Sequence, residues 1–86
     1  MTEITLIEQK ETYTGSAKIA IVASRFNSFI VERLYDGAIK TLNSSGINHE
    51  AITLVKVPGA FEIPVAVQAL LNENLYDAII TLGAII

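Results

Sequence analysis

The segment KIAIVAS (residues 18–24) decides the fold, because its centre is continuously apolar and does not alternate between polar and apolar residues. This pattern is typical of a strand in a parallel sheet that is covered on both faces. Parallel strands need crossover connections, and these are usually helices. Helices that alternate with further buried strands are therefore expected on the C-terminal side of this segment.

The sequence predicts two such helices. The first follows Ser28, an N-cap residue type, and Gly46 is a typical stop signal at its C-terminal end. Its apolar residues recur at spacings of three and four, and the expected buried face comprises Ile30, Val31, Leu34, Ala38, Ile39 and Leu42.

The second predicted helix runs from Glu62 to about Asn72. Pro64 is tolerated in its first turn, because N–H groups there lack hydrogen-bond partners anyway. Its expected buried stripe comprises Ile63, Val67, Leu70 and Leu71.

Two more strands are predicted, at residues 51–57 and from Ala78 through the segment AIITLGA. The resulting β-α-β-α-β order predicts an α/β fold, a three-layer α/β/α sandwich around a parallel sheet. Right-handed crossovers give the strand order 2-1-3 with one helix on each face.

The domain organisation is expected to have two parts. Residues 1–17 are a polar arm with one short strand at residues 4–7, and residues 18–86 form the N-terminal part of a single domain. The third strand has no following helix, so we expect the C-terminal part of the domain to be missing and the sequence to have been cut after Ile86.

Composition narrows the possible functions. A hydrophobic fraction of 51% is high for 86 residues, so part of the apolar surface is expected to meet another chain. A net charge of −3 without a basic cluster argues against nucleic acid. The chain has no cysteine and one histidine, so neither disulfides nor thiolate or histidine metal sites are expected. No apolar signal segment or membrane-length run occurs, and a cytoplasmic location is the default.

A ligand is expected at the carboxyl edge of the sheet, where open α/β sheets bind their ligands. The segment SRFNS (residues 24–28) brings Phe26, whose ring can stack on a planar ligand, and Asn27, which can donate and accept hydrogen bonds. The alternative is a hydrophobic staple and a spare N-cap. No glycine-rich phosphate loop is present, and no nucleophile–base pair is visible. His49 is expected at the opposite end of the sheet, exposed to solvent.

Two further segments end at the same edge. In PGAFE (residues 58–62) Gly59 and Ala60 permit close approach to the backbone, and Glu62 can accept hydrogen bonds from hydroxyl groups. The alternative is that Glu62 only interacts favourably with the dipole of the following helix and that Phe61 is buried in the core. In GAII (residues 83–86) the last three residues, Ala84, Ile85 and Ile86, can offer main-chain groups to an imide-like ring edge, or they are simply the tail of a strand.

The segments KIAIVASRFNSFI, VPGAFEIPVA and DAIITLGAII, in this order, resemble the lumazine synthase family. The resemblance implies a flavodoxin-like α/β fold and a transferase of riboflavin biosynthesis that needs no cofactor. Its substrates would be 5-amino-6-(D-ribitylamino)uracil and 3,4-dihydroxy-2-butanone 4-phosphate, and its product 6,7-dimethyl-8-ribityllumazine. It also implies a homo-oligomer, either a pentamer or an icosahedral shell, with the site between subunits and the N-terminal strand added to a neighbour's sheet.

The resemblance also implies roles for single residues. Phe26 stacks on the pyrimidine ring beside Asn27; Ala60, Phe61 and Glu62 line the ribityl side; Ala84, Ile85 and Ile86 hold the ring edge through main chain. The family's phosphate-binding segment and its acid/base histidine follow the position of Ile86, so no catalytic residue is assigned here. Three hypotheses remain: the N-terminal portion of a lumazine synthase, a scaffold or assembly element of the same family, and a generic flavodoxin-like binding module.

Overall fold

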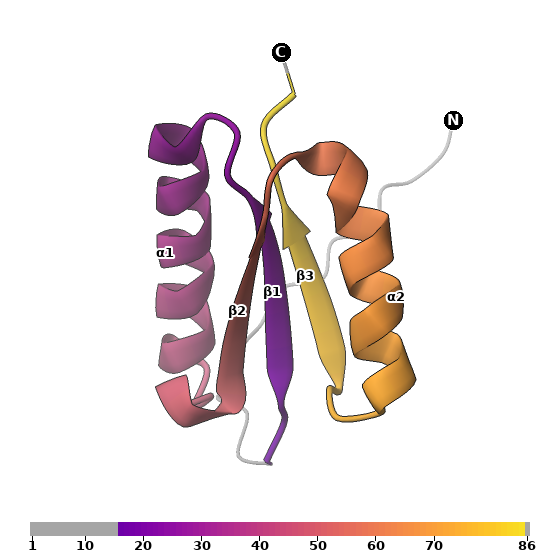
Figure 1. The fold of residues 1–86 in the computed structure, drawn as a ribbon. Helices are drawn as coiled ribbons and strands as arrows, with labels where there is room; N and C mark the ends of the chain where they lie inside the picture. The colour runs from indigo at the N-terminus through magenta and orange to yellow at the C-terminus, as the bar shows by residue number, and fades with distance from the viewer. Residues whose placement is uncertain (1–15, 86) are drawn as a thin grey trace, which may run out of the picture.

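The computed structural model describes residues 16–85, which form one parallel sheet with a helix on either side (Figure 1). The expected strand at residues 4–7 and the site residue Ile86 lie outside the described residues. The elements are β1 (Ile19–Ser24), α1 (Ser28–Ser44), η1 (His49–Ala51), β2 (Ile52–Val57), η2 (Ala60–Glu62), α2 (Ile63–Glu73) and β3 (Ala78–Leu82). The strand order is β2-β1-β3, with both pairs parallel, which confirms the predicted α/β/α topology.

The core is built around β1, in which all six residues are buried. Ala20 and Val22 pack in one cluster with Val57 and with Leu70 of α2. Successive side chains of a strand point to opposite faces. Ile19, Ile21 and Ala23 therefore face α1, in which Val31 is only 1% exposed. Each helix contacts β1, so the central strand is covered on both faces, as its apolar sequence predicts.

The predicted buried faces of the two helices are only partly correct. Ile30 and Leu34 of α1 are 48% and 40% exposed, and Leu71 of α2 is 55% exposed. The reason is geometric: each face of the sheet carries a single helix in the described residues, so no second helix covers the sides of its apolar stripe. The apolar side chains at the edges of each stripe therefore remain exposed to solvent. Ala66 of α2 instead packs against the core.

The element boundaries depart slightly from the expectation. Gly46 has a φ of 99°, which ends the first helical segment as predicted, because glycine reaches this region without strain. His49 lies in η1 and is exposed, at the amino end of β2 as expected. Ala51 belongs to η1 rather than to β2. No helix within residues 16–85 combines the length and apolar character needed to cross a membrane.

Candidate functional site

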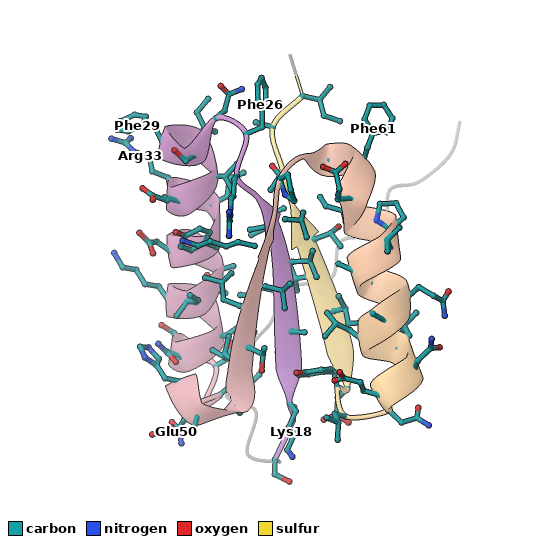
Figure 2. All side chains as sticks on the ribbon, in the orientation of Figure 1. Lys18, Phe26, Phe29, Arg33, Glu50 and Phe61 are labelled. Atoms are coloured by element: carbon teal, nitrogen blue, oxygen red, sulfur yellow. The ribbon has the colours of Figure 1, made fainter. Side chains whose placement is uncertain are left out.

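A pocket of about 500 Å³ lies where the three strands end at their carboxyl edge. Its lining residues come from the three segments that follow β1, β2 and β3, namely Phe26, Pro58, Gly59, Ala60, Phe61, Glu62, Ala84 and Ile85. In Figure 2 the rings of Phe26 and Phe61 project from this end, and Lys18 and Glu50 mark the opposite end. The volume and mostly apolar lining suit an organic molecule of moderate size.

The loop after β1 is tied to the neighbouring strand. The main-chain N–H of Arg25 donates a hydrogen bond of 2.7 Å to the carbonyl oxygen of Val57, one residue beyond the paired strands. Phe26 follows directly, lines the pocket and is 57% exposed. The hydrogen bond of Arg25 thus fixes the backbone next to Phe26, while much of the Phe26 ring remains exposed. An aromatic face in this position is available for stacking against a planar ligand.

Asn27 occupies the N-cap of α1 in the left-handed conformation, with φ 56° and ψ 51°. Its carbonyl oxygen accepts hydrogen bonds from the N–H groups of Ile30 and Val31, at 2.9 and 3.1 Å. The predicted N-cap at Ser28 is therefore wrong by one residue, because asparagine tolerates the left-handed region better than most residues do. The side chain of Asn27 makes no capping bond, and its Nδ2 atom is buried without a hydrogen-bond partner among residues 16–85. Asn27 does not line the pocket itself.

Phe61 and Glu62 are positioned by η2, a single turn between β2 and α2. Phe61 is 95% exposed, so the alternative that places it in the core is wrong: the short turn directs its side chain away from the sheet. The N–H of Glu62 donates to the carbonyl oxygen of Gly59 at 3.2 Å. The Glu62 carboxylate lies over Gly59, since a β-carbon on that glycine would stand 3.6 Å from its Oε1 atom.

Glu62 is also the N-cap residue of α2, and its side chain makes no capping hydrogen bond. The carboxylate therefore remains able to accept hydrogen bonds from hydroxyl groups of a ligand. It is the one charged side chain among the pocket's lining residues. A negative charge in this position disfavours a phosphate and suits a neutral polyol.

The third lining segment follows β3. The predicted strand extends to Ala84, but the observed strand ends at Leu82, so this part of the prediction is wrong. Ala84 and Ile85 lie beyond the register that pairs β3 with β1 and line the pocket. Their main-chain groups are thus placed outside the sheet ladder, beside a ligand space. Ile85 is 87% exposed.

The structure brings six of the eight predicted site residues together on one pocket: Phe26, Ala60, Phe61, Glu62, Ala84 and Ile85. Their roles toward a ligand stay predictions. Gly59, expected from the sequence to permit close approach to the backbone, also lines the pocket. Pro58 lines it as well and was not assigned to the site from the sequence. Its position between a strand end and a helix start is the signal that identifies it. Within residues 16–85, no three His, Cys, Asp or Glu side chains are grouped as a metal site requires.

The fold and this pocket together define a doubly wound α/β protein with a pocket at the carboxyl edge of its sheet. Comparison with protein families gives a match to 6,7-dimethyl-8-ribityllumazine synthase over residues 16–86. The chain belongs to this family, which confirms the resemblance seen in its motifs.

Individual proteins similar to this chain carry the same family name. The chain is 49% identical over 69 residues to a 6,7-dimethyl-8-ribityllumazine synthase of Desulfovibrio desulfuricans, an alignment that covers 80% of this chain and 44% of the relative. It is 50% identical over 70 residues to the protein of the same name from Halorhodospira halophila, with 81% of this chain and 45% of the relative covered. The chain thus spans about half the length of the curated relatives it matches.

Proposed function

We propose that this chain forms the pyrimidine- and ribityl-binding side of a 6,7-dimethyl-8-ribityllumazine synthase, a transferase of riboflavin biosynthesis. The enzyme would condense 5-amino-6-(D-ribitylamino)uracil with 3,4-dihydroxy-2-butanone 4-phosphate. One observation carries the proposal: the three family motifs, far apart in sequence, converge on a single pocket of about 500 Å³.

The chemistry of the lining matches the three parts of such a pyrimidine. The planar ring has the exposed face of Phe26 as a stacking partner. The imide-like ring edge needs donors and acceptors, and the main chain at Ala84 and Ile85 lies outside the sheet ladder. The ribityl hydroxyls have the Glu62 carboxylate, which makes no capping bond, as an acceptor.

The phosphate of the second substrate has no counterpart in this lining. Arg25 precedes Phe26 in the loop but does not line the pocket, and Glu62 would repel an anion. We therefore assign no catalytic or phosphate-binding residue within residues 16–85. Turnover is proposed to require a complementary segment of the kind that follows these motifs in the family.

Product formation tests this proposal directly. The 86-residue chain is mixed with both substrates, and formation of the lumazine is followed by its absorbance, with and without a complementary C-terminal segment from a relative. We expect no product from the chain alone and product after complementation. Unchanged turnover without the added segment contradicts the proposal.

Ligand choice separates the enzyme from a generic binding module. Titration of the chain with 6,7-dimethyl-8-ribityllumazine, followed by the ligand's fluorescence, should show saturable binding. Binding of a flavin without any binding of ribityl-substituted pyrimidines or lumazines would instead indicate a flavodoxin-like module.

A second candidate function, a non-catalytic scaffold or assembly element, is favoured by exposed apolar side chains. Phe61, just before α2, and Val65 of α2 are 95% and 74% exposed, and Phe29 of α1 is 71% exposed, so each helix presents large apolar side chains that a neighbouring chain could cover. Both candidates include self-association, as a pentamer or a larger shell. Light scattering tests the assembly role, and a monomeric, soluble species would argue against it.

A further inference from the structure

Gly83 leaves little room for a side chain beside Ser24, at the end of the sheet that carries the pocket. Ser24 is the last residue of β1, two residues before Phe26, and Gly83 directly precedes Ala84. A β-carbon on Gly83 would stand 3.3 Å from Ser24 Oγ, 3.8 Å from Ser24 Cβ and 3.6 Å from Ile63 Cδ1. Ile63 is the first residue of α2 and follows Glu62. The three pocket-forming segments therefore meet around this one glycine.

The requirement for glycine here is steric. No positive φ is found at Gly83, which separates it from Gly46 with its φ of 99°. An added methyl group would therefore not strain the backbone, but it would approach Ser24 Oγ more closely than side-chain contacts normally allow. Ser24 has little room to yield, because it is 2% exposed in the most buried strand of the sheet.

The Ser24 hydroxyl makes no hydrogen bond among residues 16–85, so no bond of its own fixes it in this contact. Its position follows from β1, and the position of Gly83 follows from β3. Ser24 leads into the Phe26 loop and Gly83 leads into Ala84 and Ile85, so the approach of residues 24 and 83 bears on the separation of these two segments. We propose that Ser24 and Gly83 act as positioning residues that set the width of the pocket between its aromatic side and its main-chain side.

This inference rests on the proposed function, because the width matters for a flat ring held between Phe26 and the main chain. Stacking and main-chain hydrogen bonds both weaken steeply with distance. Displacement of either the aromatic side or the main-chain side of the pocket would therefore weaken both interactions with the ring. A methyl group at Gly83 should push the Ala84–Ile85 segment away from Phe26. Ring-containing ligands would then bind less tightly.

The test is a double-mutant cycle with Gly83→Ala, Ser24→Ala and the double variant, using 6,7-dimethyl-8-ribityllumazine as the fluorescent probe. Gly83→Ala should weaken binding about three- to tenfold, the range typical of residues in direct contact. The loss should be largely recovered in the double variant, because removing Oγ leaves Ser24 Cβ, at 3.8 Å, as the nearest atom of residue 24. The matched control is Gly37→Ala, since a β-carbon on Gly37 meets nothing within 4 Å.

A ligand-free readout distinguishes failure of this inference from failure of the proposed function. In two-dimensional amide NMR spectra, Gly83→Ala should shift the signals of Phe26, Ala84 and Ile85, and the double variant should return them toward wild type. Ser24→Thr, which adds a methyl group from the β1 side, should move the same signals if Gly83→Ala does not fold. If the wild-type chain does not bind 6,7-dimethyl-8-ribityllumazine but the variants show these amide shifts, the proposed function is wrong and the positioning role of Ser24 and Gly83 is supported.

Three results would overturn the inference. One is unaltered probe affinity and unaltered amide signals in Gly83→Ala. Another is a double variant that is as impaired as Gly83→Ala. The third is an equal effect from Gly37→Ala, which would show that the loss reflects general sensitivity to substitution.

Discussion

Lys18 and Asp77 are joined by two hydrogen bonds at the point where β1 and β3 begin. The main-chain N–H of Lys18 donates to Asp77 Oδ2 at 2.7 Å, and the N–H of Asp77 donates to the carbonyl oxygen of Lys18, also at 2.7 Å. The next residues, Ile19 and Ala78, are the first registered pair of the two strands. The side chain of Asp77 thus closes the end of the sheet opposite the pocket and helps to fix the register that places Gly83 beside Ser24.

Removal of this carboxylate should destabilise the protein without touching the pocket. Asp77→Ala is expected to lower the free energy of unfolding by about 1–2 kcal/mol, because a short hydrogen bond to a charged acceptor is lost. Asp77→Asn keeps an acceptor oxygen and should lose less. Urea unfolding followed by circular dichroism measures both variants. An unchanged free energy of unfolding in Asp77→Ala would show that the hydrogen bond at Lys18 contributes nothing.

The left-handed conformation of Asn27 makes a second stability prediction. Asn27→Ala should lower the free energy of unfolding by about 1 kcal/mol more than Asn27→Gly, because a β-carbon at φ 56° is unfavourable and glycine avoids it. Both variants lose the same buried amide, so their difference isolates the backbone. Asn74, with φ 57° after α2, offers the same comparison at an exposed position. Identical unfolding curves for the alanine and glycine variants of Asn27 would refute this account.

The sequence predicts the elements of this fold well, because they depend on patterns within single segments. The unbroken apolar run of β1 identifies a central parallel strand, and the strand order follows from crossover handedness. The exposure of Phe61 was not predictable in this way, because a short turn can direct its side chain either way. The close approach of Ser24 and Gly83 joins the end of β1 to the residue that follows β3, so no local sequence pattern contains it. The motifs predicted the candidate site residues, whereas the spacing of the pocket walls needed the structure.

Loss of the Phe26 ring should weaken ligand binding while leaving stability nearly unchanged. Phe26→Ala is expected to reduce affinity for 6,7-dimethyl-8-ribityllumazine about tenfold, the usual cost of removing an aromatic stacking partner. The ring is 57% exposed, so its removal leaves no large cavity in the core. Phe29→Ala is the control, because Phe29 is an exposed aromatic residue close by that does not line the pocket. Comparable loss of affinity in both variants would argue against stacking on Phe26.

The role of Glu62 can be tested with two ligands that differ in the ribityl chain. Glu62→Ala should weaken binding of 6,7-dimethyl-8-ribityllumazine by about five- to tenfold, as expected for lost hydrogen bonds to a charged acceptor. It should leave binding of 6,7-dimethyllumazine, which has no ribityl chain, almost unchanged. Fluorescence titration of both ligands gives the ratio. Parallel losses for the two would place Glu62 at the ring rather than at the hydroxyls.

The outer edge of β3 is expected to make the chain self-associate in solution. Among residues 16–85, β3 pairs with β1 alone, so its other edge presents unpaired main-chain groups in the apolar segment AIITL. Exposed strand edges of this kind template pairing between chains, and a lysine placed on them opposes it through charge and desolvation. Thr81→Lys should therefore reduce the average mass measured by light scattering. Thr41→Lys, an exposed threonine on α1, adds the same charge away from the edge and should leave that mass unchanged. If both substitutions lower the average mass equally, net charge rather than the β3 edge controls association. A monodisperse monomer of the unsubstituted chain would show that the β3 edge does not cause association.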